Sequence, residues 1–207
     1  MPDLAHQFQD LEQQRTADTL GMWAFLATEM MLFGAMFLGY TVYRWHYPRA
    51  FYLGAQRTDM VLGSLNTALL LTSSLSMALG VHFQRARHFG RVALCLGVTA
   101  LLGAGFLALK LLEYWHHYQE GLAPGLNFHF PGPEASQVAL FFVFYFVMTG
   151  LHAVHMTIGL GLVGFQTARA YRAESRLMPV TLTGLYWHFV DVIWVFLYPL
   201  FYLGGRS

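Results

Sequence analysis

Five ionisable side chains lie inside stretches apolar enough to cross a membrane, and they are the residues of this chain best suited to chemistry. They are Glu29, His152, His155, His188 and Asp191. Carboxyl and imidazole groups can transfer protons, and imidazole can also ligate a metal ion. An aspartate at the centre of a membrane helix costs roughly 2.5 to 3.5 kcal/mol, so such residues usually face a protein interior and mark a functional or assembly site.

The elements that must position these side chains are five apolar runs, each near the roughly 20 residues that a helix needs to span a bilayer. The runs are continuous and do not alternate in polarity, which favours helices over a barrel. The sequence therefore predicts an all-α polytopic membrane protein, with one bundle of five transmembrane helices over residues 20–203. The predicted spans are 20–43, 60–81, 92–114, 138–165 and 182–203.

Composition supports the membrane assignment. The 207 residues are 56% hydrophobic and 11% charged, whereas soluble domains contain about 25% charged residues. The net charge is +1 and no basic block is present, so no nucleic-acid partner is expected. The single cysteine, Cys95, excludes a disulfide within the chain. Residues 1–19 are too acidic for a signal peptide and are predicted to form a surface segment on the inner side.

Arginines predict the orientation of the chain, because basic residues favour the cytoplasmic side of a membrane. With the N-terminus inside, the inner side carries Arg15, Arg85, Arg87, Arg91, Arg169, Arg172 and Arg176. The outer side then carries Arg44, Arg49, Arg57 and Arg206. We therefore expect a cytoplasmic N-terminus and a C-terminus on the outside.

With this orientation, three of the ionisable residues share one depth. Glu29 and Asp191 lie roughly 13 to 14 Å from the inner ends of their helices, and His155 lies roughly 15 Å from the inner end of its own. His152 is one turn further out than His155, and His188 is one turn inward of Asp191. We expect a buried polar cluster that locks three helices together, with Glu29 bonded to His155 and Asp191 bonded to His188. The alternative makes Glu29 a carboxyl that relays protons.

Two further polar pairs favour structural roles. Lys110 and Glu113 are spaced i, i+3 near the outer end of the third run, where an ion pair or snorkelling to the interface is easy. Asn66 and Ser73 give the second run a polar seam that can hydrogen-bond a neighbouring helix.

Histidines could in principle form a metal site. The candidate ligands are His116, His117, His152, His155 and His188. The first two follow the outer end of the third run and are well separated in depth from the others, so the five cannot converge. We therefore predict no metal site in this chain.

Five motifs, in order along the chain, resemble those of the cytochrome c oxidase subunit III family of haem-copper oxidases. They are Gly21-Met-Trp-Ala-Phe-Leu-Ala-Thr-Glu29-Met-Met-Leu-Phe, Leu65-Asn66-Thr67, Leu109-Lys-Leu-Leu-Glu113-Tyr114, the segment from Phe142 through His152-Ala-Val-His155 to Gly159, and Tyr186-Trp-His188-Phe-Val-Asp191-Val-Ile-Trp194. The match covers almost all of residues 20–203. Many family members have seven helices, and this chain resembles the last five. In those members the first two helices splay away to form a lipid-filled cleft, so such a cleft is not expected wholly within this chain. The missing pair is either dispensable or fused to a partner chain.

The resemblance implies a function. It implies a subunit without haem or copper of its own, bound to catalytic subunit I and other subunits of a proton-pumping oxidase in a bacterial inner membrane. Haem and copper are expected in those partner subunits. In the family, this subunit stabilises the catalytic centre, supports proton uptake and binds phospholipid. The five ionisable residues named first match family positions, and none is a redox ligand there.

Two alternatives remain open at this point. The equivalent subunit of a quinol oxidase or of a nitric-oxide-reductase-associated complex would share the same fold and role. A transporter or channel is a different class of function. It is disfavoured because the chain shows no inverted repeat and no pair of broken helices at mid-membrane.

Overall fold

The computed structural model describes residues 10–171 and 180–204, and these residues form helices without any strand. The elements are α1 (Leu11–His46), α2 (Pro48–Ala55), α3 (Met60–Arg85), α4 (Phe89–Gln119), α5 (Ala135–Tyr171), α6 (Val180–Tyr198) and the π-helical turn η1 (Pro199–Leu203). Within the described part, α1, α3, α4, α5 and α6 extended by η1 are long and apolar enough to cross a membrane. The predicted fold class, an all-α polytopic membrane protein with five spanning helices, is confirmed.

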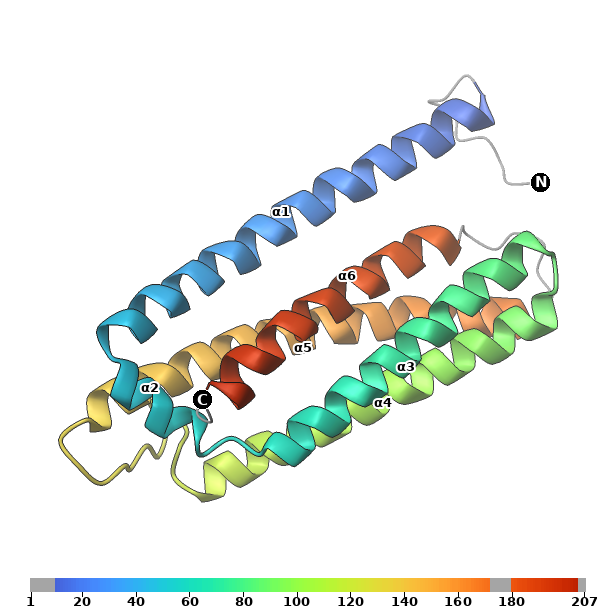
Figure 1. Cartoon of the computed structure of the whole chain (residues 1–207). Helices are drawn as coiled ribbons and strands as arrows, with labels where there is room; N and C mark the ends of the chain where they lie inside the picture. Colours follow the sequence, from blue (N-terminus) through green and yellow to red (C-terminus); the bar gives the residue numbers. More distant parts are fainter. Residues whose placement is uncertain (1–9, 172–179, 205–207) are drawn as a thin grey trace.

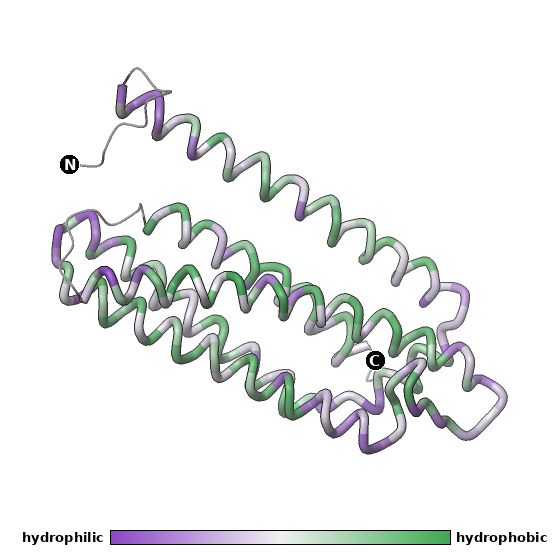
Figure 2. The backbone as a smooth tube through the Cα atoms, turned by 180° about the vertical axis from the view of Figure 1, so that it is seen from behind, coloured by the Kyte–Doolittle hydropathy of each residue, from purple (hydrophilic) through white to green (hydrophobic). Residues whose placement is uncertain are grey.

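The spanning helices run side by side (Figure 1). Coloured by hydropathy, the chain is hydrophobic along the middle of the bundle and hydrophilic at its ends and connections (Figure 2). Burying each apolar stretch in lipid or against another helix satisfies both the side chains and the helical backbone. The protein is therefore a multi-pass membrane protein.

Burial is unequal among the helices. In the most apolar stretch of α6, 56% of the residues are buried within the chain, whereas the corresponding value for α1 is 11%. Helix α1 lies along one side of the bundle and diverges from α6 toward its own N-terminal end (Figure 1). The few polar contacts that α1 makes with the other helices therefore have a large share in holding it in place.

The helices extend beyond the spans predicted from the sequence. Helix α1 begins at Leu11, so it runs through the boundary at residue 19 that separated the predicted surface segment from the first span. Asp10 caps it by accepting a hydrogen bond from the backbone N–H of Gln13 at 2.7 Å. The polar residues that follow Asp10 are compatible with a helix, although they end the apolar run. Residues 1–9 of the predicted segment lie outside the described residues.

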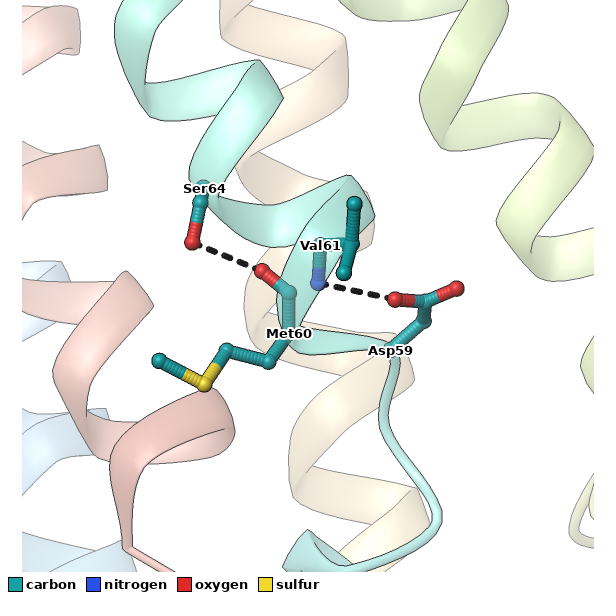
Figure 3. Close-up of a pocket in the computed structure, with 4 residues that line it drawn as sticks. All are labelled: Asp59, Met60, Val61 and Ser64. Atoms are coloured by element: carbon teal, nitrogen blue, oxygen red, sulfur yellow. Dashed lines mark hydrogen bonds between the residues drawn. The ribbon is translucent and has the colours of Figure 1, made fainter.

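The start of α3 forms a shallow hollow lined by Asp59, Met60, Val61 and Ser64 (Figure 3). Its polar groups serve the helix itself. Asp59 accepts hydrogen bonds from the backbone N–H groups of Val61 at 2.8 Å and Leu62 at 3.2 Å, and Ser64 donates to the Met60 carbonyl at 2.7 Å. The Ser64 hydroxyl also lies 2.8 Å from the Tyr198 hydroxyl on α6, so the polar groups of the hollow cap α3 and connect it to α6.

Candidate functional site

Glu29 on α1 contacts His155 on α5. The Glu29 Oε2 atom lies 2.9 Å from His155 Nε2, and the two side chains are only 16% and 11% exposed. The other ring nitrogen, Nδ1, lies 2.9 Å from the Leu151 carbonyl oxygen. The structure thus brings together the first pair of the predicted cluster, and it joins the least buried helix to α5.

Hydrogen-bond chemistry limits the protonation of this pair. A carbonyl oxygen can only accept, so His155 Nδ1 carries a proton. The contact between Nε2 and the carboxyl then requires one further proton, held either by the imidazole or by Glu29. Glu29 and His155 therefore share one proton at a position where two transmembrane helices meet.

The third helix at this point is α6. Tyr186 on α6 donates from its hydroxyl to the His155 backbone carbonyl at 3.0 Å. Phe33 on α1 packs its ring against the imidazole, with 5.5 Å between ring centroids. Together these contacts orient the His155 ring and connect α1, α5 and α6.

The predicted hydrogen bond between Asp191 and His188 does not form. His188 Nδ1 lies 2.7 Å from the hydroxyl of Ser74 on α3. Asp191 is 4% exposed, and neither of its carboxyl oxygens has a hydrogen-bond partner among the described residues. Ser74 also lies beside Asp191, but its hydroxyl bonds only to His188. His188 and Asp191 are one turn apart on α6, so both side chains project toward α3. His188 therefore bonds to Ser74 of α3 and not to Asp191.

His152 does not join the cluster either. It is fully buried, and neither ring nitrogen has a hydrogen-bond partner among the described residues. Its ring packs between Phe106 on α4, at a centroid distance of 5.6 Å, and Trp194 on α6, at 5.3 Å. The predicted single cluster is therefore replaced by two separate contacts, Glu29–His155 and His188–Ser74, and by two enclosed side chains, His152 and Asp191.

Lys110 and Glu113 form an ion pair, but in the bundle interior. Each side chain is 2% exposed, and Lys110 Nζ lies 3.0 Å from Glu113 Oε2. The ion pair was one of the two predicted arrangements. The other, snorkelling to the interface, is wrong, because α4 continues to Gln119, beyond the predicted end at residue 114, and the parts of α5 and η1 that carry Tyr145 and Tyr202 cover the pair.

Two tyrosines, neither of them predicted from the sequence, complete this ion pair. Lys110 Nζ donates to the hydroxyls of Tyr145 on α5, at 2.8 Å, and Tyr202 in η1, at 2.7 Å. The Tyr202 hydroxyl in turn donates to Glu113 Oε1 at 2.7 Å. We call these four residues the Lys110 hub. It is a network of charged and phenolic groups that joins α4, α5 and η1.

Of the two residues in the predicted polar seam of α3, Ser73 hydrogen-bonds a neighbouring helix and Asn66 does not. Ser73 is fully buried and accepts a hydrogen bond from the Trp187 indole N–H at 3.1 Å. Asn66 is also fully buried, but no partner for its amide is found in the described part of the chain. The neighbouring Thr67 accepts instead from the Trp194 indole at 3.1 Å. Trp187 and Trp194 were missed because an indole N–H in an apolar run gives no sign of the helix that it contacts.

The side chains that could ligate a metal ion are dispersed over the described structure. Within residues 10–171 and 180–204, no three histidine, cysteine, aspartate or glutamate side chains gather closely enough to hold a metal ion.

Comparison with known proteins gives a consistent result. A family model described as cytochrome c oxidase subunit III matches residues 11–206. The chain is 33% identical over 189 residues to cytochrome c oxidase subunit 3 of Bacillus subtilis (strain 168), covering 90% of this chain and 86% of the relative. It is 30% identical over 190 residues to quinol oxidase subunit 3 of the same strain, with the same coverage. It is 28% identical over 189 residues to cytochrome bo(3) ubiquinol oxidase subunit 3 of Pseudomonas aeruginosa, covering 89% and 84%.

Proposed function

The chain belongs to the cytochrome c oxidase subunit III family, and from this we propose that it is a non-redox membrane subunit of a proton-pumping terminal respiratory oxidase. The observation that carries the proposal is a family match extending over residues 11–206, which includes all five spanning helices. The partners are catalytic subunit I, the other oxidase subunits and membrane lipids. In this proposal, haem and copper belong to the partner subunits.

We propose two tasks for this subunit: stabilising the catalytic subunit and supporting proton uptake. The first task is supported by the buried polar contacts, which make the bundle a defined scaffold. The second is supported by the proton that Glu29 and His155 share inside the membrane. The subunit itself carries out no redox step.

Cytochrome c is the proposed electron donor. It is supported by the 33% identity to a cytochrome c oxidase subunit 3, although two quinol oxidase subunits 3 are 30% identical. Because of these quinol oxidase relatives, quinol is the second candidate for the electron donor. The donor itself is bound by other subunits.

Purification of the intact complex tests the proposed function. We expect an affinity-tagged chain to bring down a haem- and copper-containing catalytic subunit, with a haem absorption spectrum and oxygen consumption driven by reduced cytochrome c. Consumption driven only by quinol would transfer the assignment to a quinol oxidase. A tagged chain that carries no haem protein would refute the proposed function.

We propose a bacterial plasma membrane location with the N-terminus in the cytoplasm. All of the relatives named above are bacterial. The arginine bias supports the orientation, although Arg172, Arg176 and Arg206 lie outside the described residues. A single cysteine introduced at His88, in the connection between α3 and α4, should react with a membrane-impermeant reagent only after the membrane is opened. Labelling in intact cells would show the opposite orientation, with this connection on the outside.

Substitution of Glu29 separates a structural role from proton relay. We expect Glu29→Gln to retain assembly and turnover, because its amide can still hydrogen-bond His155. Glu29→Leu should weaken the attachment of α1 by about 1.5 to 3 kcal/mol, because it removes a hydrogen bond to an ionisable group. The free energy of unfolding of the subunit in mixed micelles measures the attachment of α1, and oxygen consumption with proton release by the complex measures function.

Glu29→Asp is the charge-preserving control for this series. If Glu29→Gln assembles normally but pumps far fewer protons per electron than Glu29→Asp, Glu29 is a relay carboxyl and the structural interpretation fails. If both variants assemble, turn over and pump like the unmodified complex, the relay interpretation fails.

A further inference from the structure

Asp191 is an enclosed acid without a hydrogen bond. It is 4% exposed, and neither of its carboxyl oxygens has a hydrogen-bond partner among the described residues. An ionised carboxylate in such a place is far more costly than the neutral acid, so a buried carboxyl group without a partner keeps its proton. A neutral carboxyl group has one O–H to donate. Asp191 therefore needs a hydrogen-bond acceptor on a neighbouring helix.

Two contacts with α3 lie on either side of Asp191. On one side, His188 Nδ1 lies 2.7 Å from the Ser74 hydroxyl, and on the other the Trp194 indole donates to Thr67 at 3.1 Å. Thr67 also donates to the Gly63 carbonyl at 2.9 Å. Ser74 lies beside Asp191, and among the described residues its hydroxyl bonds to His188 alone. Ser74 therefore has the capacity to accept a second hydrogen bond, from Asp191.

A hydroxyl group can connect an acid with an imidazole, because it donates one hydrogen bond and accepts two. With Asp191 neutral, its O–H donates to Ser74, and Ser74 donates to the unprotonated Nδ1 of His188. Moving one proton along each of these bonds leaves an Asp191 carboxylate, an intact Ser74 hydroxyl and a doubly protonated His188 ring. The chain of three side chains can therefore carry a proton between Asp191 and His188 with no change in total charge.

His188 connects this chain to the end of the bundle where α3 ends and α6 begins. It is half-buried and lines a cleft of about 470 Å³ between α1, α3 and α6. Three exposed lining residues, His82, Arg85 and Thr181, lie at the mouth of the cleft. Thr181 is seven residues from His188 on α6, a distance of roughly 10 Å along the helix. The cleft thus leads from His188 to the aqueous phase at this end, which is cytoplasmic in the proposed orientation.

The other ionisable groups of the bundle are engaged elsewhere. Residues 60–81 of α3 contain no aspartate, glutamate, lysine, arginine or histidine. Glu29 of α1 is bonded to His155 of α5, and Lys110 of α4 is paired with Glu113. His188 is therefore the ionisable group that faces Asp191 across Ser74, and the three residues form a site separate from both of those contacts.

We propose that Asp191 is a proton-binding site, which exchanges its proton through the Ser74 hydroxyl and His188 with the cleft between α1, α3 and α6. Asp191 holds the proton, and Ser74 and His188 transfer it. The site goes beyond the proposed function, in which the shared proton lies between Glu29 and His155. It depends on α3 and α6 of this chain and on no partner subunit.

Infrared spectroscopy of the purified full chain in detergent micelles tests whether Asp191 holds a proton. The C=O stretching band of a protonated carboxyl group is separate from the bands of a carboxylate. The chain has five aspartates, of which Asp10, Asp18 and Asp59 are exposed and Asp3 lies outside the described residues. We expect a protonated-carboxyl band at neutral pH that shifts with isotope-labelled aspartate and disappears in Asp191→Asn. The isotope shift identifies an aspartate band even if Asp191→Asn does not fold.

Deuterium exchange of the same band tests the route of the proton. We expect Ser74→Ala and His188→Asn to slow exchange in heavy water about 100-fold or more, because a positioned proton-transfer group contributes about 10²–10⁴-fold to a rate. His188→Asn retains a side chain that can hydrogen-bond Ser74, so it separates proton transfer from packing. Ser76→Ala is the matched control. Ser76 is two residues from Ser74 but donates to the Cys95 carbonyl of α4 at 2.9 Å, and its loss should leave the exchange rate unchanged.

Three results would overturn the proposal. The first is a chain without a protonated-aspartate band at neutral pH. The second is exchange at the unmodified rate in both Ser74→Ala and His188→Asn, and the third is equal slowing in Ser76→Ala. Because the measurements use this chain alone, the site can fail while the chain still copurifies with a haem protein, and the proposed function can fail while the site persists.

Discussion

Replacing Lys110 with methionine is expected to destabilise the folded protein by about 3 to 5 kcal/mol. The substitution leaves the Glu113 carboxylate enclosed, with both side chains of the pair only 2% exposed in the native structure. It also removes the hydrogen bonds that Lys110 donates to the Tyr145 and Tyr202 hydroxyls. Unfolding by sodium dodecyl sulfate titrated into mixed micelles measures the free energy of unfolding.

A surface ion pair provides the control. Arg49 lies 3.3 Å from Glu134, and its side chain is 83% exposed. Arg49→Gln should therefore change stability by less than about 1 kcal/mol. The double variant Lys110→Met with Glu113→Leu should recover much of the loss, since it leaves neither charge buried. A Lys110→Met protein as stable as Arg49→Gln would show that the Lys110 hub does not hold α4, α5 and η1 together.

Trp187→Ala is the second substitution with a large expected effect, about 3 to 5 kcal/mol of destabilisation. Trp187 is fully buried in α6. Its ring lies against two glycines. A Cβ atom on Gly103 of α4 would be 2.6 Å from the indole, and one on Gly159 of α5 would be 3.3 Å away. Truncation at this position would leave a cavity where three helices are in close contact, and the same micelle unfolding measures the loss.

Two variants show which property of Trp187 matters. Ser73→Ala removes the acceptor for the indole N–H, together with the local hydrogen bond from the Ser73 hydroxyl to the Leu70 carbonyl, and should cost about 1 kcal/mol. Trp45→Ala removes an indole that is 83% exposed, and should change stability within about 0.5 kcal/mol. If Ser73→Ala costs as much as Trp187→Ala, the hydrogen bond and not the packing is the main contribution of this tryptophan.

The contact between Glu29 and His155 could be predicted because it depends mainly on depth. Helical rise converts sequence position into height in the membrane, and the two residues fall at nearly the same height on helices that cross in opposite directions. Depth says nothing about rotation around a helix axis. Asp191 shares the same height as Glu29 and His155, but it faces elsewhere and has no hydrogen-bond partner in the described structure.

The Lys110 hub marks the limit of inference from local spacing. The i, i+3 relation of Lys110 and Glu113 indicated a pair, but their burial depends on Tyr145 and Tyr202, which lie 35 and 92 residues from Lys110 in sequence. No local pattern connects those positions. The π-helical turn that contains Tyr202 begins at Pro199, which has no N–H to donate in a regular helix.

The sequence by itself determined that this protein lies in a membrane, how many of its helices span that membrane, and the family to which it belongs. Long apolar runs must satisfy their backbone in a helix when water is absent, and this constraint acts on each run separately. Only the tertiary structure decided which polar side chains meet, since that depends on helix rotation and neighbour contacts. It separated Glu29–His155 from His188–Ser74 and enclosed His152 and Asp191.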